Sequence, residues 1–222
     1  MSQKKRLYKR IKGFFKPKPD TRVALWENHR LLYLRVPKVG NTSIMQSIEC
    51  TQTRYMWSDE IRALNDTWTT FSFVRNPWAR IVSAYLDKIR GETGLQPMVN
   101  GVYEGFLSAG MRVHPSMSFA EFCEVVCDTP DEKIDRHLRS QASFLIRDDR
   151  PIVRFIGRLE DMDRDWQTVM DAVGLDFPLR HLNRTSRQHY SEYFGDHRLV
   201  NLVGDRYAED GRFFNYDFEK AH

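Results

Sequence analysis

The chain has 222 residues, of which 41% are hydrophobic and 13% aromatic, a composition that excludes an intrinsically disordered protein. Its apolar runs are shorter than the roughly 18 residues of a membrane-spanning helix, and three cysteines are too few for a disulfide framework. The net charge of +4 is uneven: residues 1–20 hold eight lysines and arginines against one aspartate, so they carry +7 and residues 21–222 carry −3. Because a nucleic-acid-binding domain carries basic charge on its folded body, we expect no nucleic-acid partner.

Residues 1–20 are predicted to form a basic, flexible tail, and residues 21–222 a folded domain. The tail also carries apolar residues at nearly helical spacing: Leu7, Ile11, Phe14 and Phe15. Such a segment can lie on an anionic membrane surface, whereas the simpler interpretation is a solvated terminus. The tail lacks the apolar run of a signal peptide. We therefore expect a cytoplasmic protein, with peripheral contact of the tail at the inner membrane surface as an alternative.

Three strands are predicted, each followed by a helix. The strands are the runs 31–36, 69–74 and 152–156, and the helices are the runs 44–48, 78–90 and 162–173. Strands that alternate with helices predict an α/β domain whose parallel sheet carries helices on both faces. Residues 91–118 are rich in glycine and are expected to form a long loop that covers a site. Ser118 and Glu121 then provide the capping box of a further helix.

The loop after the first strand has the composition of an anion-binding loop. Between Pro37 and the following helix it contains Lys38, Val39, Gly40, Asn41, Thr42 and Ser43. In a parallel sheet, a turn from a strand into a helix directs backbone N–H groups toward a ligand such as a phosphate. The loop is not a Walker loop, in which the lysine follows the second glycine. By itself it is equally consistent with a structural turn.

The second strand also ends in residues suited to an anion. Arg75 follows the strand directly, and Ser83 lies two helical turns into the next predicted helix. A guanidinium group binds phosphate with two parallel hydrogen bonds. The structural alternatives are an ion pair for Arg75 and a packing role for Ser83. Two anion-directed loops at two strand ends require a ligand with two separated anionic groups, such as an adenosine bisphosphate.

Three segments match the motifs of a known family. RVPKVGNTS, residues 35–43, resembles the 5′-phosphosulfate-binding loop of sulfotransferases, and FVRNPWARIVSAY, residues 73–85, resembles their 3′-phosphate-binding segment. DRHLRSQ, residues 135–141, is similar to the D-x-H-x-x-x-Q signature of carbohydrate sulfotransferases of the chondroitin and HNK-1 type. The resemblance covers about residues 30–218. It departs at Leu138 and Ser140, where those enzymes usually carry Trp and Pro.

The resemblance implies a single-domain, P-loop-like α/β fold and a definite reaction. The sulfuryl group of 3′-phosphoadenosine 5′-phosphosulfate would pass to an acceptor hydroxyl, foremost of a carbohydrate, and leave adenosine 3′,5′-bisphosphate. Lys38 would stabilise the leaving phosphate, with the loop as far as Ser43 around the 5′-phosphate. Arg75 and Ser83 would hold the 3′-phosphate. No metal ion is expected, because the transferred group carries a single negative charge.

A base is expected to take the proton of the acceptor hydroxyl. We predict His137, because it lies within the matching signature and Asp135 could orient its ring. The alternatives are His114, Asp59 and Glu60.

The segment 183–187 is predicted to close over the nucleotide through Ser186 and Arg187, or else to be solvated surface. Two other functions fit part of the pattern. One is a P-loop-type kinase in which Lys38 binds a nucleoside triphosphate and Glu160 or Asp161 holds Mg²⁺. The other is a non-catalytic module that binds a nucleotide or a glycan.

Overall fold

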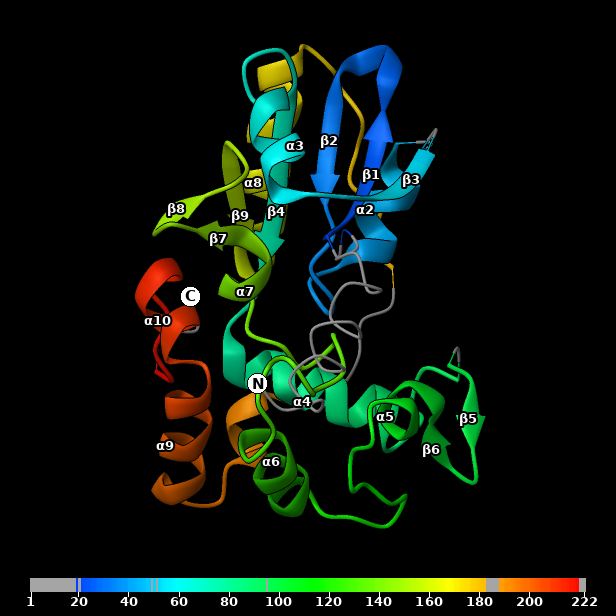
Figure 1. The fold of residues 1–222 in the computed structure, drawn as a ribbon, viewed down its shortest axis with the longest axis vertical. Coiled ribbons are helices and arrows are strands. Elements are labelled where there is room, and N and C mark those ends of the chain that lie inside the picture. Colours follow the sequence, from blue (N-terminus) through cyan, green and yellow to red (C-terminus); the bar gives the residue numbers. More distant parts are fainter. Residues whose placement is uncertain are drawn as a thin grey trace, which may run out of the picture.

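A five-stranded sheet forms one half of the molecule, and a group of helices forms the other (Figure 1). The computed structural model describes residues 19, 21–48, 50, 52–94, 96–182 and 188–219. The strand order is β3-β1-β2-β4-β9, with β1 Thr21–Trp26, β2 Leu31–Leu34, β3 Gln52–Met56, β4 Thr69–Val74 and β9 Phe155–Arg158. The predicted tail, residues 1–20, lies outside the described residues except for Pro19.

The three predicted strands pair in parallel, as expected. They are β2, β4 and β9. The sheet is not parallel throughout, because β1 and β3, which the sequence patterns do not predict, add an antiparallel edge. Only the short 3-10 turn Glu27–His29 joins β1 to β2, and so short a connection permits only an antiparallel pair. Four of the five residues of β3 are exposed, so this strand carries no clear apolar alternation.

The four predicted helices are confirmed within a few residues. They are α2 Asn41–Ser47, α4 Pro77–Lys88, α6 Phe119–Cys127 and α8 Met162–Val173. The predicted capping box of α6 is present, since Ser118 Oγ accepts a hydrogen bond of 3.3 Å from the Glu121 N–H. The other described α-helices are α3 Ser58–Leu64, α5 Glu104–Ser108, α7 Ala142–Leu145, α9 His197–Arg206 and α10 Ala208–Phe214.

The third predicted strand is displaced by three residues. It is expected at 152–156 and lies at Phe155–Arg158. The residues before it belong to a hairpin of β7 Ile146–Arg147 and β8 Arg150–Pro151. The hydrogen bond from the Ile152 N–H to the Leu145 carbonyl joins the residues that flank this hairpin. A second hairpin, β5 Met98–Val99 with β6 Val102–Tyr103, lies within the predicted long loop.

Helix α4 begins where β4 ends and runs into the helical half of the molecule, where it packs against α6 and α9 (Figure 1). All of its residues are buried, among them the polar side chains of Arg80, Ser83, Asp87 and Lys88. Buried charges require partners or a ligand, so this helix marks the part of the molecule where a site is expected.

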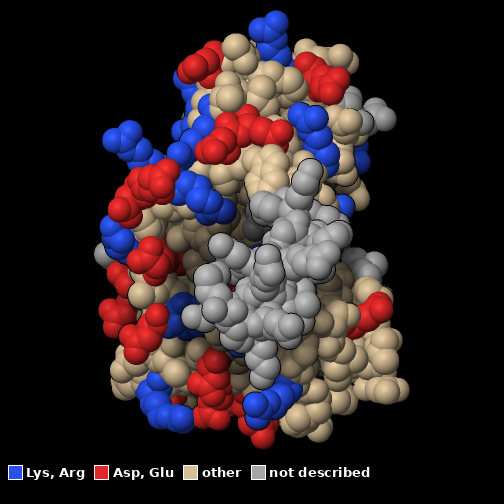
Figure 2. Space-filling model, viewed as in Figure 1, with Lys and Arg blue, Asp and Glu red and all other residues tan. Residues whose placement is uncertain are grey.

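Charged side chains of both signs are interspersed on the surface of the described residues. Figure 2 shows Lys and Arg next to Asp and Glu across one face of the molecule. Among the helices that the structure describes, none combines the length and the apolar composition needed to cross a membrane.

Candidate active site

A cavity of about 580 Å³ opens beside the carboxyl ends of β2 and β4. This volume is within the usual range for a small-molecule site. The structure brings most of the predicted site residues to its walls: Lys38, Gly40, Asn41, Thr42, Ser43, Arg75, Ser83 and His137. The side chain of Val39 is instead fully buried in the core beneath the loop. Ser186 and Arg187 lie outside the described residues.

The loop from Lys38 to Ser43 has a tightly specified backbone. Lys38 and Gly40 have φ angles of 71° and 82° and so lie in the left-handed region. This conformation is unfavourable for a lysine. A Cβ atom on Gly40 would lie 3.0 Å from Met162 Cε, so the loop also needs glycine for close packing. Asn41 braces the turn, because its Nδ2 donates to the Val36 carbonyl at 2.8 Å and its Oδ1 accepts from the Tyr33 hydroxyl at 2.7 Å.

Ser43 ties the loop to a distant segment. Its Oγ accepts a hydrogen bond of 3.1 Å from the N–H of Leu182. Leu182 directly precedes residues 183–187, the segment predicted to close over a nucleotide. The first anion-directed loop therefore holds Leu182 at the cavity wall.

Gln141 holds the main chain of Arg75 in place. The Arg75 N–H donates to Gln141 Oε1 at 2.9 Å, and the Arg75 carbonyl accepts from Gln141 Nε2 at 2.8 Å. The next residue, Asn76, caps α4 by accepting from the N–H groups of Trp78 and Ala79. The hydrogen bonds of Arg75 found within the described residues are those of its main chain, and the Glu160 carboxylate, also at the cavity wall, is the nearby charge that favours the cationic guanidinium. A guanidinium held in this way at a cavity wall is suited to an anionic ligand.

Arg80 holds three parts of the site together. It is 1% exposed, and its guanidinium donates to the carbonyls of Pro37 at 3.1 Å, Arg139 at 2.8 Å and His137 at 3.2 Å. One residue of α4 thus connects the first loop to the segment that carries His137. The sequence places Arg80 in a motif but gives no indication of this bracing role.

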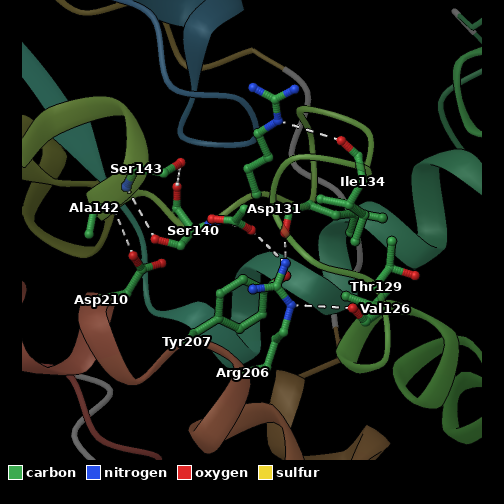
Figure 3. A network of polar contacts seen from close by, with 12 residues as sticks. Val126, Thr129, Asp131, Ile134, Ser140, Ala142, Ser143, Arg206, Tyr207 and Asp210 are labelled. Carbon is green, nitrogen blue, oxygen red and sulfur yellow. Dashed lines mark hydrogen bonds and ion pairs between the residues drawn. The ribbon is translucent and has the colours of Figure 1, made fainter. Parts of the chain in front are cut away.

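The C-terminal helices hold the segment around His137 (Figure 3). Asp131 accepts from the Ser140 N–H at 3.2 Å and pairs with Arg206 of α9 at 2.6 Å. Asp210 of α10 accepts from the Ala142 N–H at 2.8 Å. A proline has no N–H to donate, so the serine at position 140 gives this chain an anchor that the more usual proline could not supply.

His137 lies at the cavity wall, and two neighbouring side chains contact its ring. Its Nδ1 lies 2.6 Å from Asp135 Oδ1, and its ring meets the Tyr103 ring edge-on. This pairing favours the tautomer with the proton on Nδ1, which leaves Nε2 able to accept one. Burial lowers the pKa of His137 below its ordinary value, although Asp135 opposes this shift. The imidazole is therefore neutral at neutral pH, the form in which it can act as a base.

Asp87 and Lys88 are among the charged residues of the cavity wall that sequence reasoning misses. Asp87 and Lys88 end α4, and Asp87 Oδ2 lies 2.8 Å from Lys38 Nζ and 3.4 Å from Lys88 Nζ. The hydroxyl of Thr93 donates to the other Asp87 oxygen. The sequence does contain an indication of Asp87, because it lies four residues after Ser83 and therefore on the same face of the predicted helix.

The other candidate bases lie away from the cavity wall. His114 is exposed and contacts Ser116. Glu60 accepts from the Trp57 N–H at the start of α3, next to Asp59.

The two carboxylates considered for Mg²⁺ in the kinase alternative have partners within the protein. Glu160 accepts from the Asn76 N–H and the Tyr216 hydroxyl, and Asp161 pairs with Arg164.

Comparisons with known proteins identify the family of this chain. The model of the sulfotransferase family matches residues 22–217. Mouse carbohydrate sulfotransferase 12 is 29% identical over 152 residues, which cover 58% of this chain and 35% of that protein. The chain thus spans about a third of the length of that relative. No solved structure matches the chain. Because the family model covers most of the chain, including both anion-directed loops and the His137 segment, this protein belongs to the sulfotransferase family.

Proposed function

We propose that the protein transfers the sulfuryl group of 3′-phosphoadenosine 5′-phosphosulfate to a hydroxyl group of a carbohydrate. The observation that carries this proposal is the meeting of two anion-directed loops, around Lys38 and Arg75, at one cavity together with His137. Membership of the sulfotransferase family supports the donor. The similarity to a carbohydrate sulfotransferase supports a sugar acceptor.

Each loop takes one end of the donor in this proposal. The 5′-phosphosulfate lies against the loop from Lys38 to Ser43, where Val39 contributes only its backbone because its side chain is in the core. The 3′-phosphate lies against Arg75 and Ser83. Ser186 and Arg187 remain predicted contacts of the nucleotide.

The reaction is a single displacement at sulfur. The acceptor oxygen forms a bond to sulfur, the bond from sulfur to the bridging oxygen breaks, and the hydroxyl proton passes to His137 Nε2. Negative charge develops on the leaving 5′-phosphate. The Lys38 ammonium group stabilises that charge more strongly in the transition state than in the ground state, which is the requirement for catalysis.

Replacement of Arg75 by alanine is expected to weaken the binding of adenosine 3′,5′-bisphosphate by about 1.5–3 kcal/mol, since a charge-assisted hydrogen bond to the 3′-phosphate is lost. Calorimetric titration measures this change. Arg112→Ala, at an exposed position away from the cavity wall, is the matched control and should bind as the wild type does. Equal affinity of Arg75→Ala and the wild type would contradict the assignment of the 3′-phosphate.

The pH dependence of kcat/KM should follow the neutral imidazole of His137. Because burial lowers the pKa of this residue, the rate should be level at neutral pH and fall tenfold per unit only below the ordinary histidine pKa of about 6.5. The Asp135 carboxylate raises the pKa of His137, so Asp135→Asn should move this acid limb to still lower pH. An acid limb centred above 6.5, or one unmoved by Asp135→Asn, would contradict the assignment.

A transfer assay tests the proposed function. The protein is incubated with the sulfate-labelled donor and a panel of glycans, and mass spectrometry identifies the sulfated position. Adenosine 3′,5′-bisphosphate without magnesium should also raise the melting temperature, whereas ATP with Mg²⁺ should not. Stabilisation by ATP with Mg²⁺ alone would favour the kinase. Nucleotide binding without transfer to any glycan would favour the non-catalytic module.

A further inference from the structure

Three charged side chains, Lys38, Asp87 and Lys88, contact one another beside the first loop. Asp87 Oδ2 is shared between Lys38 Nζ at 2.8 Å and Lys88 Nζ at 3.4 Å. The side chains of Asp87 and Lys88 are 4% and 0% exposed, and that of Lys38 is 13% exposed. One carboxylate therefore faces two ammonium groups, of which the more accessible is the one that the proposed reaction uses.

Lys88 is left without a hydrogen bond. Its Nζ atom has no hydrogen-bond partner among the described residues, and its contact with Asp87 Oδ2 is an ion pair at 3.4 Å. The ammonium group lies 3.9 Å from the centre of the Tyr103 ring, a favourable contact that satisfies none of its three N–H groups. The other nearby carboxylate, Asp135, is already paired with His137. A fully buried ammonium group with unsatisfied donors is costly, so this arrangement calls for an explanation.

The donor competes with Asp87 for Lys38. To stabilise the leaving phosphate, the Lys38 ammonium group must give up its 2.8 Å contact with Asp87. Asp87 would then have only the longer contact of 3.4 Å with Lys88 to balance its buried charge, and a buried charge without a close partner is strongly unfavourable. The hydroxyl of Thr93 holds the second carboxylate oxygen, so the carboxylate is not free to follow Lys38.

The geometry points to Lys88 as the positioning residue that replaces Lys38 on Asp87 when the donor binds. This inference rests on the proposed function. A movement of a few tenths of an ångström brings a contact of 3.4 Å into the range of a hydrogen bond. Lys88 thereby satisfies a donor, Asp87 keeps a cation, and Lys38 turns to the phosphate. Lys88 acts on the reaction through Asp87 and Lys38, without touching either substrate.

A double-mutant cycle tests this role. Lys88→Met removes the replacement cation and should lower kcat on the order of tenfold or more, with the acceptor KM within twofold of wild type. In an Asp87→Asn background no carboxylate retains Lys38, so adding Lys88→Met should change kcat less than twofold. Lys133→Met, at an exposed position, is the matched control and should behave as wild type.

Melting temperatures and titration with adenosine 3′,5′-bisphosphate establish that each variant is folded. If Lys88→Met does not fold, Lys88→Gln takes its place in the cycle. An equal loss of kcat in both backgrounds would overturn the inference, because Lys88 would then act on the reactants directly or only through packing. A wild-type rate for Lys88→Met would overturn it as well. A wild type that neither binds the nucleotide nor transfers sulfate would instead contradict the proposed function, and this inference with it.

Discussion

Replacement of Lys38 by alanine is expected to lower kcat roughly 10³-fold or more while the protein still binds adenosine 3′,5′-bisphosphate. The ammonium group opposes the charge that develops on the leaving phosphate, so its loss is felt mainly in the transition state. The fold should tolerate the change, because Lys88 still lies 3.4 Å from the Asp87 carboxylate.

The measurement for Lys38 combines steady-state kinetics with calorimetric titration of the product nucleotide. Lys133→Ala, an exposed substitution, serves as the control for removal of one positive charge. Unchanged turnover of Lys38→Ala would exclude this residue from the chemistry. Loss of nucleotide binding with an unchanged kcat at saturation would assign it to binding alone.

Replacement of His137 by alanine is expected to lower transfer about 10²- to 10⁴-fold, the contribution of a positioned general base. Nucleotide affinity should stay within twofold of wild type, because the histidine faces the acceptor side of the proposed reaction. The main chain of this segment should stay in place, since Arg80 binds the carbonyl at position 137 and not the imidazole.

Transfer kinetics and nucleotide titration on the same His137→Ala preparation check this expectation. Full activity of the variant would move the role of base to His114, Asp59 or Glu60. The structure gives none of these three a place at the cavity wall. That result would therefore also require a change in the shape of the site during the reaction.

Local patterns in the sequence predict the parallel half of the sheet and the two loops at the cavity wall. The run at 31–36 is largely apolar and the run at 69–74 is rich in β-forming residues, and they are ended by Pro37 and Arg75, so both strand ends are visible in the sequence. Parallel neighbours bring those ends to one edge of the sheet, and the two loops meet there for that reason.

The remaining features depend on contacts between distant parts of the chain. Asp87 and Lys88 are enclosed by residues from other parts of the chain, among them Lys38 of the first loop and Tyr103 of β6. The carbonyl partners of Arg80 are likewise visible only in three dimensions. The antiparallel edge of the sheet could not be predicted for a different reason. The exposed strand β3 does not show the alternation of apolar and polar residues that is typical of a half-buried strand.

A crystal structure of the protein with adenosine 3′,5′-bisphosphate tests the central claim most directly. The account predicts one nucleotide that spans both loops, with its 3′-phosphate against the Arg75 guanidinium and Ser83 and its 5′-phosphate within reach of Lys38 and the backbone of residues 39–43. A nucleotide bound elsewhere, or one with only one of its phosphates at these loops, would contradict it.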